Sequence, residues 1–197
     1  DASDPGCTTD LSSWHGTHVA GIVAAGINGF GVVGVAPEIR VLPVRVSSCG
    51  GGGQTAILNG VRWAAGLAVP GYPVNPNPAD VINISMGALA ACDSVSQAVF
   101  DEVTSVGALV IAAAGNERLP ASNSSPANCR NVMSVGSSLD NGDRASYSNY
   151  GSDVDVYAPG GPLTSGILST IDIGANRPRG DGYARYPGTS MAAPVVS

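Results

Sequence analysis

The feature that most constrains the fold is an alternation of short apolar runs with segments of helical periodicity. The apolar runs cover residues 39–46 (IRVLPVRV), 80–85 (DVINIS) and 108–114 (ALVIAAA). Continuous runs of this length, rich in Val and Ile, are typical of strands buried on both faces of a sheet. Apolar residues at helical spacing follow the first two runs, over residues 57–68 and 95–106. The alternation predicts an α/β fold: a three-layer, doubly wound, mostly parallel sheet with right-handed crossovers.

The sequence also predicts where the second helix begins and ends. Ser94 and Gln97 have the spacing of a capping box, and Gly107 follows the last apolar position as a stop. From about Leu119 the sequence is richer in Ser, Asn, Gly and Pro, which predicts loops and short strands around the sheet. No internal repeat or linker interrupts residues 1–197, so one domain is expected.

Charge and hydropathy exclude several classes of protein. The chain has 44% hydrophobic and 12% charged residues, which is typical of a folded globular chain. A net charge of -6, without any Lys/Arg run, argues against a nucleic-acid partner, because that binding depends on neutralising phosphates. No apolar stretch approaches the roughly 20 residues of a membrane span. We therefore expect no nucleic-acid partner and no membrane segment.

The four cysteines lie in turn-like surroundings, and none of them forms a CxxC metal clip. Disulfides are therefore expected, and disulfides favour a secreted protein. Three pairings are conceivable. We expect the one without interlacing loops. It places the loop before the histidines against the glycine run and the start of the second crossover helix against the SPANC loop, joining Cys7 to Cys49 and Cys92 to Cys129.

His15 and His18, the only histidines, open the run HGTHVAGIVAA. They are either a metal pair or one catalytic base and one packing residue. A zinc protease helix needs HExxH with a glutamate base, which HGTH lacks, so the metal reading fails. His18, one turn further in and followed by apolar residues, is expected to be buried support. The GxGxxG run from Gly29 follows a helix and leads into a strand, which is the wrong context for dinucleotide binding, and a GxSxG elbow is absent.

Glycine-containing loops follow all three expected strands, at residues 47–54, 85–87 and 115–117. The carboxyl ends of parallel strands share one edge of a sheet, where ligands gather. His15 and Ser190 each begin a helical run, and helix starts tend to lie at that edge. Singly, a serine before a helix is usually a cap, and an asparagine after glycine is usually a turn residue. Together, Ser190, His15 and Asn116 supply the nucleophile, base and oxyanion donor of acyl transfer.

These residues lie in stretches that resemble the subtilisin-like serine proteases, the subtilase family. The stretches occur in the family's order and cover nearly the whole chain: HGTHVAGIVAA, GVVGVAP, NISMGA, AAAGNE, RASYSNYG, VYAPGG and GTSMAAP. The cysteine-containing stretches resemble the secreted, disulfide-bearing bacterial branch. The resemblance implies a subtilisin-like fold in which His15 is the general base, Ser190 the nucleophile and Asn116 the oxyanion donor.

The resemblance also implies where a polypeptide substrate binds. An extended peptide would pair with the strand of Gly51, Gly52 and Gly53 on one side and the strand of residues 85–87 on the other. Glu117, at the pocket rim, would favour basic side chains. The small wall residues would leave room for a large apolar or aromatic side chain; they are Ser85, Met86, Gly87, Ala113, Ala114 and Gly115.

A structural calcium ion is implied by the loop GINGFGV, which resembles the family's calcium loop. The ligands would be the side-chain oxygen of Asn28 and the carbonyls of Gly26, Phe30 and Val32. The alternative is a simple glycine turn. The family's remaining ligands would fall before Asp1, so the site is expected to be incomplete here.

The acid of the Asp-His-Ser triad is expected upstream of Asp1, because the family carries it on a strand roughly 30 residues before the histidine. Asp1, Asp4 and Asp10 lie in a turn-rich loop and are not assigned to it. At the other end, Val195 stands where the family usually has a histidine. We therefore expect a peptidase domain incomplete at both termini, inactive by itself, and monomeric, with an N-terminal propeptide during maturation. The alternative function is an inactive relative that keeps the cleft for peptide binding.

Overall fold

The structure, a computed structural model, describes residues 12–47 and 52–197. It confirms the α/β architecture. In chain order, the elements of this part are α1 (His15–Ala24), α2 (Gln54–Ala64), β1 (Val81–Ile84), β2 (Ala88–Leu89), α3 (Ser94–Ser105), β3 (Leu109–Ala113), a 3-10 turn (Ala121–Asn123), β4 (Ser124–Ser125), β5 (Val132–Ser138), β6 (Val156–Pro159), β7 (Ile167–Asp172), β8 (Asp181–Tyr186) and α4 (Thr189–Val196).

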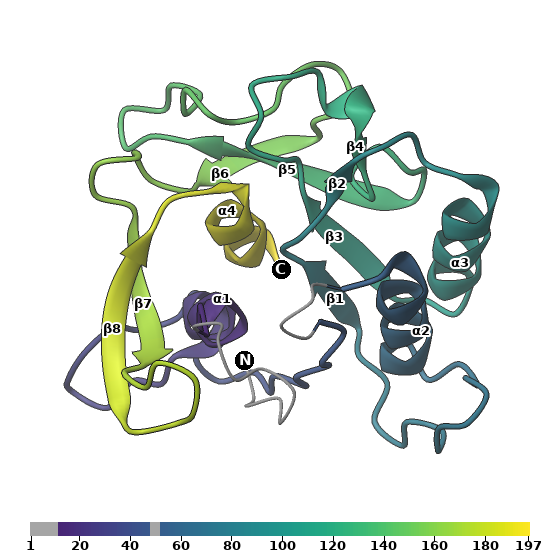
Figure 1. Ribbon diagram of the computed structural model, residues 1–197, viewed down its shortest axis with the longest axis horizontal. Coiled ribbons are helices and arrows are strands. Elements are labelled where there is room, and N and C mark those ends of the chain that lie inside the picture. The colour runs from purple at the N-terminus through teal and green to yellow at the C-terminus, as the bar shows by residue number, and fades with distance from the viewer. Residues whose placement is uncertain (1–11, 48–51) are drawn as a thin grey trace.

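A parallel four-stranded sheet with the order β1-β3-β5-β6 forms the middle layer. Helices α2 and α3 cover one face, while α4 covers the other with α1 beside it (Figure 1). Two short antiparallel pairs, β2-β4 and β7-β8, lie outside this sheet. The three-layer arrangement brings the carboxyl ends of β1 and β3 to one edge, as the sequence predicts.

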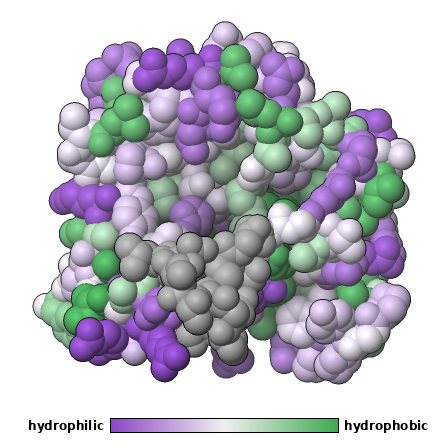
Figure 2. Space-filling view, viewed as in Figure 1, coloured by the Kyte–Doolittle hydropathy of each residue, from purple (hydrophilic) through white to green (hydrophobic). Residues whose placement is uncertain are grey.

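Alternate residues of the strands feed two apolar cores. Val110 and Ala112 of β3 face α2 and α3, whereas Ile111 and Ala113 face Ala192 and Ala193 of α4. These four residues of β3 are at most 4% exposed. This burial on both faces explains why β3 has a continuous apolar sequence. On the face shown in Figure 2, polar and apolar side chains are interspersed outside the grey residues.

The predicted strand at residues 39–46 is wrong. The segment has no regular secondary structure and joins no sheet in the described part of the chain, and Ile39, Val41 and Leu42 are 49%, 43% and 40% exposed. A strand needs a neighbour for its backbone hydrogen bonds, and Pro43 has no N–H to donate. Only the second half of the segment is packed, with Val44 against the α2 and α3 core.

Two other predictions need correction. The region after Leu119 supplies β5 and β6, two strands of the main sheet, and not only peripheral elements. Helix α3 is capped by Asp93, whose Oδ1 accepts hydrogen bonds from the backbone N–H groups of Val95 (2.9 Å) and Ser96 (2.8 Å), and not by Ser94. Gln97 reaches sideways to Asp101 instead of back to a cap. Gly107, at φ 97°, does end the helix. Within the described ranges, no helix has the length and apolar character needed to cross a membrane.

Candidate active site

Ser190 is the second residue of α4 and lies at the end of β1. Its Oγ donates to the carbonyl oxygen of Ser85 (3.0 Å), and Ser85 Oγ donates to the carbonyl oxygen of Ser190 (2.8 Å). Pro194, four residues later, has no N–H for the Ser190 carbonyl, so the Ser85 hydroxyl takes the place of the missing helical donor. The nucleophile candidate is thereby tied to the sheet edge.

Gly188 makes the sharp entry into α4. Its φ of 153° favours glycine, and its N–H donates to the carbonyl oxygen of Gly160 (3.1 Å), just after β6. A Cβ on Gly160 would lie only 2.5 Å from the Gly188 oxygen, so both glycines permit this close approach. The helix start consequently lies against the sheet edge.

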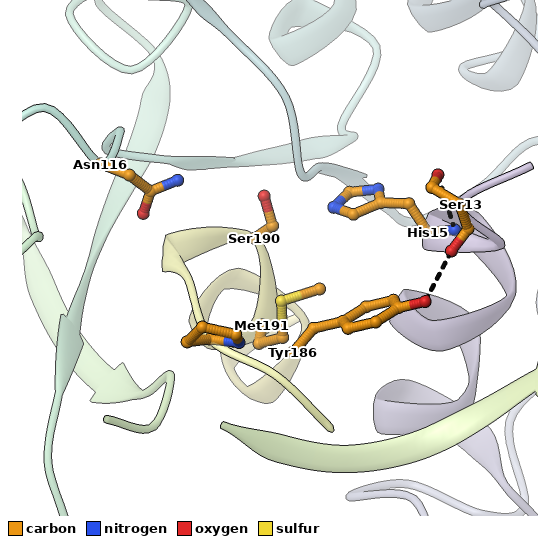
Figure 3. A pocket seen from close by; sticks show the side chains of 7 residues that line it. Ser13, His15, Asn116, Tyr186, Ser190 and Met191 are labelled. Carbon is orange, nitrogen blue, oxygen red and sulfur yellow. Dashed lines mark hydrogen bonds between the residues drawn. The ribbon is translucent and has the colours of Figure 1, made fainter. Parts of the chain in front are cut away.

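Asn116, three residues beyond the end of β3 at Ala113, is oriented by Thr189. Its Oδ1 accepts from Thr189 N (2.9 Å) and from Thr189 Oγ1 (3.1 Å), which itself accepts from Gly115 N (3.1 Å). These two donors fix the oxygen and nitrogen of the side-chain amide. Nδ2 therefore lies on the Ser190 side, where it has no acceptor among the described residues (Figure 3).

His15 is the first residue of α1, and its backbone N–H donates to Ser13 Oγ (3.3 Å). Burial lowers the pKa of the imidazole below its ordinary value, which favours the neutral form that a base requires. Ser190 lies between His15 and Asn116 in Figure 3. No carboxylate of the described part of the chain forms a hydrogen bond or ion pair with the His15 ring.

One cavity of about 410 Å³ brings the three predicted catalytic residues together. Its lining consists of Ser13, His15, Asn116, Tyr186, Pro187, Ser190 and Met191. Sequence reasoning missed Tyr186 and Ser13, because nothing near either residue marks it as part of a site. They meet because Tyr186 OH donates to the carbonyl oxygen of Ser13 (2.8 Å) across 173 positions of sequence.

His18 is the packing residue that the sequence predicts. It is fully buried, its ring stacks on Tyr186 with the centroids 4.5 Å apart, and its Nε2 contacts the carbonyls of Ile167 (3.1 Å) and Ala184 (3.0 Å). Two carbonyl neighbours require Nε2 to carry the proton. Within the described ranges, no group of three or more His, Cys, Asp or Glu residues is placed to hold a metal ion.

The residues predicted to wall the substrate pocket do not all meet. Met86 packs toward the α2 and α3 core, whereas Ala113 faces α4 and Ala114 is fully buried. Gly87 and Gly115 instead border one short stretch: a Cβ on Gly87 would lie 2.7 Å from the Ser125 oxygen, and one on Gly115 would lie 2.9 Å from Ser124 Oγ.

The two remaining parts of the predicted substrate site lie near the surface. Glu117 is exposed, and its Oε2 accepts from Asn149 Nδ2 (2.8 Å), a partner that sequence reasoning did not identify. Gly52 and Gly53 are exposed just before α2, and Gly51 lies outside the described residues. The assignment of these residues to substrate binding stays a prediction.

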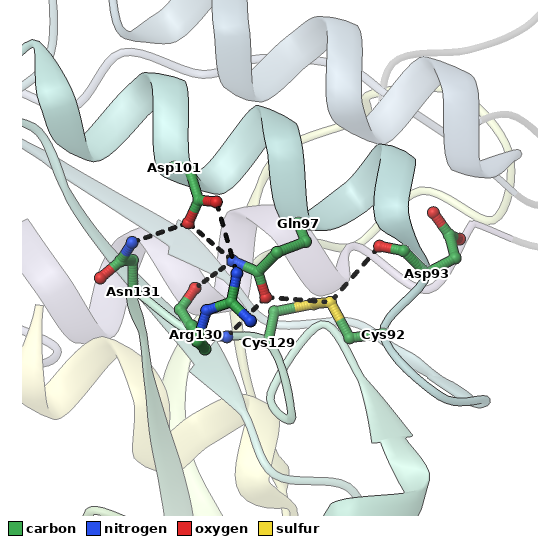
Figure 4. Close-up of polar contacts among 7 residues, drawn as sticks. All are labelled: Cys92, Asp93, Gln97, Asp101, Cys129, Arg130 and Asn131. Atoms are coloured by element: carbon green, nitrogen blue, oxygen red, sulfur yellow. Dashed lines mark hydrogen bonds and ion pairs between the residues drawn. A yellow bond between two sulfur atoms is a disulfide. The ribbon is translucent and has the colours of Figure 1, made fainter.

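The structure confirms the Cys92–Cys129 disulfide, which joins the start of α3 to the loop before β5 (Figure 4). Gln97 reinforces this connection, since its Nε2 donates to Asp101 (2.8 Å) and to the carbonyl of Arg130 (3.1 Å), while its Oε1 accepts from Arg130 N (2.9 Å). The predicted Cys7–Cys49 pair lies outside the described residues.

The predicted calcium loop offers few ligands. Asn28 Oδ1 accepts from Phe30 N (3.3 Å) in a local turn, and no carboxylate lies between residues 26 and 32. Ca²⁺ takes about six to eight oxygen ligands, carboxylates prominent among them. One amide oxygen and the three carbonyls of Gly26, Phe30 and Val32 do not by themselves fit the ion, so calcium stays a prediction.

Comparison with known proteins places this geometry in a family. The family model described as "Subtilase family" matches residues 1–197. An extracellular basic protease of Dichelobacter nodosus is 47% identical over 195 residues, 98% of this chain and 32% of that protein. An extracellular protease of Xanthomonas campestris pv. campestris is 47% identical over 187 residues, 94% of this chain and 32% of that protein.

The solved structure of a protease from Pseudoalteromonas arctica superimposes with a TM-score of 0.92 at 48% identity, over 95% of this chain and 57% of that one. The chain thus spans 32% of the length of these two curated relatives. The match over all 197 residues and the shared fold lead to one conclusion: the chain belongs to the subtilase family.

Proposed function

We propose that this chain supplies the nucleophile, base and oxyanion site of a secreted serine endopeptidase. The observation that carries the proposal is that Ser190, His15 and Asn116 line one cavity, with Asn116 Nδ2 turned to the Ser190 side. Acyl transfer needs these three roles at one point. A peptide-binding relative without activity would need the groove but not a neutral imidazole beside a hydroxyl.

The mechanism follows from these positions. The Ser190 hydroxyl turns from the Ser85 carbonyl to the imidazole, and Oγ attacks the scissile carbonyl carbon while His15 takes its proton. The oxygen that gains the electron pair accepts hydrogen bonds from Asn116 Nδ2 and from a first-turn amide of α4. Collapse breaks the C–N bond, and His15 gives the proton to the leaving amine. Water then attacks the acyl-enzyme by the same route and restores Ser190.

The third member of the triad is proposed to lie outside residues 1–197, as the family resemblance implies. Two observations support a further strand beside β1. In the described part of the chain, β1 pairs only with β3, so its other edge is open. The segment 39–46 joins no sheet in the described part of the chain, and the apolar residues Ile39, Val41 and Leu42 within it are exposed. An acid on that strand would hold the imidazole and stabilise its protonated form.

The proposed substrate is an extended polypeptide that pairs with residues 85–87 and with the strand before α2. The side chain preceding the scissile bond would enter beside Gly87 and Gly115, which have no side chains of their own to obstruct it. Glu117, held by Asn149, would add a preference for basic groups at the rim. Secretion is supported by the disulfide and by relatives named as extracellular proteases. A maturation propeptide and a monomeric state complete the proposal.

A fluorophosphonate probe on the full-length protein tests the proposal. Labelling at Ser190 requires an activated hydroxyl, so we expect stoichiometric modification at that residue and hydrolysis of casein. Ser96, a buried serine of α3, serves as the internal control and should stay unmodified. If full-length protein binds peptides but is neither labelled nor hydrolytic, the peptide-binding alternative is the correct one. Residues 1–197 alone are proposed to be inactive, because the acid would be absent.

A further inference from the structure

The segment just before the base is bound to the β7-β8 hairpin at three points. Ser12 N donates to the carbonyl of Ala175 (2.6 Å), and the indole Nε1 of Trp14 donates to the carbonyl of Gly174 (2.6 Å). At the opposite end of the hairpin, Tyr186 OH donates to the carbonyl of Ser13 (2.8 Å). These three partners come from the turn and the last residue of the hairpin, and none from the main sheet.

Trp14 needs this support because its backbone is left-handed, at φ 51° and ψ 25°. A bulky residue in that region is strained and persists only where the surroundings hold it. Its side chain is 6% exposed, and its indole hydrogen bond is buried. The Trp14 carbonyl accepts from His18 N (2.9 Å), so the same residue begins α1 and sets the direction in which His15 leaves the helix.

The hairpin turn is itself organised to present these carbonyls. Asp172 Oδ1 accepts from Gly174 N (2.7 Å) and Arg179 N (2.8 Å), and Oδ2 accepts from Gly180 N (3.1 Å). A carboxylate that accepts three backbone amides holds a loop in one conformation. The turn carbonyl that receives the Trp14 indole is therefore fixed by charge-assisted hydrogen bonds.

The body of the hairpin grips the first turns of α1. Ser169 Oγ donates to the carbonyl of His18 (2.7 Å), and Thr170 Oγ1 donates to the carbonyl of Thr17 (3.1 Å). The His18 ring stacks on Tyr186 and contacts backbone oxygens of both β7 and β8. Every described polar contact between this helix start and the hairpin converges on residues within four positions of His15.

We propose that Trp14 and Tyr186 are positioning residues, through which the β7-β8 hairpin aims the imidazole of His15 at Ser190. The inference rests on the proposed function of His15 as base. Tyr186 acts through Ser13, whose carbonyl it holds and whose hydroxyl accepts from His15 N. Because Tyr186 also lines the cavity, direct contact with the substrate is the competing explanation, and the two differ in which kinetic constant responds.

The test compares Tyr186→Phe with Tyr183→Phe in the full-length protein. Tyr183 is on the same strand, but its ring packs over Gly31, away from Ser13. We expect Tyr186→Phe to lower kcat about tenfold with KM within about twofold, because a small displacement of a catalytic group is costly to the chemical step. Labelling by a small fluorophosphonate, which has no leaving peptide to contact, should slow by the same factor. Tyr183→Phe should change neither rate.

A spectroscopic measurement separates this proposal from the proposed function. With ¹³C-labelled histidine, assigned by His15→Gln, the imidazole of His15 should titrate at a higher pH in Tyr186→Phe and in Trp14→Phe. The reason is that a loosened ring regains water and loses the burial that lowers its pKa, whereas His18 stays buried. An unchanged His15 titration, or a loss confined to KM, overturns the positioning role. A shifted titration in a protein that fluorophosphonate does not label supports positioning and overturns the proposed endopeptidase.

Discussion

The two sides of the cavity are held by different parts of the molecule. Ser190 is in the first turn of α4, in which Met191 is 1% exposed and Ala192 and Ala193 are fully buried against the main sheet. His15 begins α1, which is fastened mainly to the separate β7-β8 hairpin. The nucleophile and Asn116 are therefore anchored to the main sheet, while the base is anchored largely to the hairpin. Catalysis in such an arrangement depends on how well the hairpin keeps the two in register.

The strongest test asks whether the two sides act as one unit. Ser190→Ala and His15→Ala should each lower kcat by about 10⁶-fold, the size of the loss in subtilisin, a member of the same family, and the double variant should lose no more. Steady-state kinetics on purified full-length protein, with thermal unfolding as a check on the fold, measures this. Losses that multiply in the double variant would mean that the two residues contribute independently.

Asn116→Asp tests the sheet side alone. Aspartate keeps the oxygen that accepts from Thr189, and its charge suits a helix N-terminus, so stability should hold. The donor toward the oxyanion is lost, and kcat should fall by at least about 10²-fold at nearly constant KM, as for the equivalent donor in subtilisin. Kinetics on a peptide anilide measures the effect. Asn141→Asp, in an exposed turn, is the matched control; comparable activity of both variants would remove Asn116 from the oxyanion role.

The sequence predicts the part of the site that the main sheet holds better than the part that the hairpin holds. On the sheet side, β1, β3 and the glycine loops after them are local patterns, and Asn116 and Ser190 were found through them. Strand β5 was missed because four of its seven residues are serine or glycine, with buried serines such as Ser134 and Ser137 in place of aliphatic residues. Ser137 Oγ shares a hydrogen bond with Tyr147 OH (2.7 Å), whereas Ser134 Oγ has no hydrogen-bond partner among the described residues.

On the hairpin side, the sequence identified His15 but not what holds it. Trp14 and Gly174 are 160 positions apart, and no local sequence pattern predicts a hydrogen bond between residues so far apart. The strand expected at residues 39–46 failed for a related reason: a local pattern records a preference for extended backbone, but pairing depends on a neighbour. Residues whose role is set by their own neighbours in sequence were predictable, and residues whose role is set by distant partners were not.

Ser85→Ala tests how firmly the main sheet holds Ser190, for comparison with how firmly the hairpin holds His15. The variant removes the hydroxyl that donates to the Ser190 carbonyl but leaves the backbone oxygen that accepts from Ser190 Oγ. The variant also removes the hydrogen bond that Ser85 Oγ accepts from Asn83 Nδ2 (2.9 Å). Since α4 is also held by buried packing, these losses should lower kcat by only about threefold. Parallel kinetics with Tyr186→Phe checks the ranking. If Ser85→Ala lowers kcat more than Tyr186→Phe does, the main sheet holds Ser190 less firmly than the hairpin holds His15. That result would contradict the proposed difference between the two sides.

The smallest effect is expected from Asp172→Asn, which loosens the hairpin turn one contact away from Trp14. Desolvation raises the pKa of the Asp172 carboxyl, but hydrogen bonds from the amides of Arg179, Gly174 and Gly180 outweigh it and hold the pKa below its ordinary value. A carboxyl with a depressed pKa in the fold contributes stability above its unfolded pKa of about 3.9, and that stability is lost as the pH falls through the folded value.

Hydrogen exchange of the peptide spanning residues 172–186 measures how far the Asp172 carboxylate stabilises the turn at each pH. In the parent protein, protection of the Gly180 amide should be retained at pH 5 and decline as the pH falls below about 4, after correction for intrinsic rates. Asparagine presents an N–H group to Gly180 where the carboxylate presented an oxygen, so Asp172→Asn should lack protection at both pH values. Because Trp14 and Tyr186 still hold the base, kcat at neutral pH should fall by no more than about twofold. Asp140→Asn, in another exposed turn, should leave protection in this peptide unchanged. Full protection of Gly180 in Asp172→Asn would show that the turn is ordered without the carboxylate.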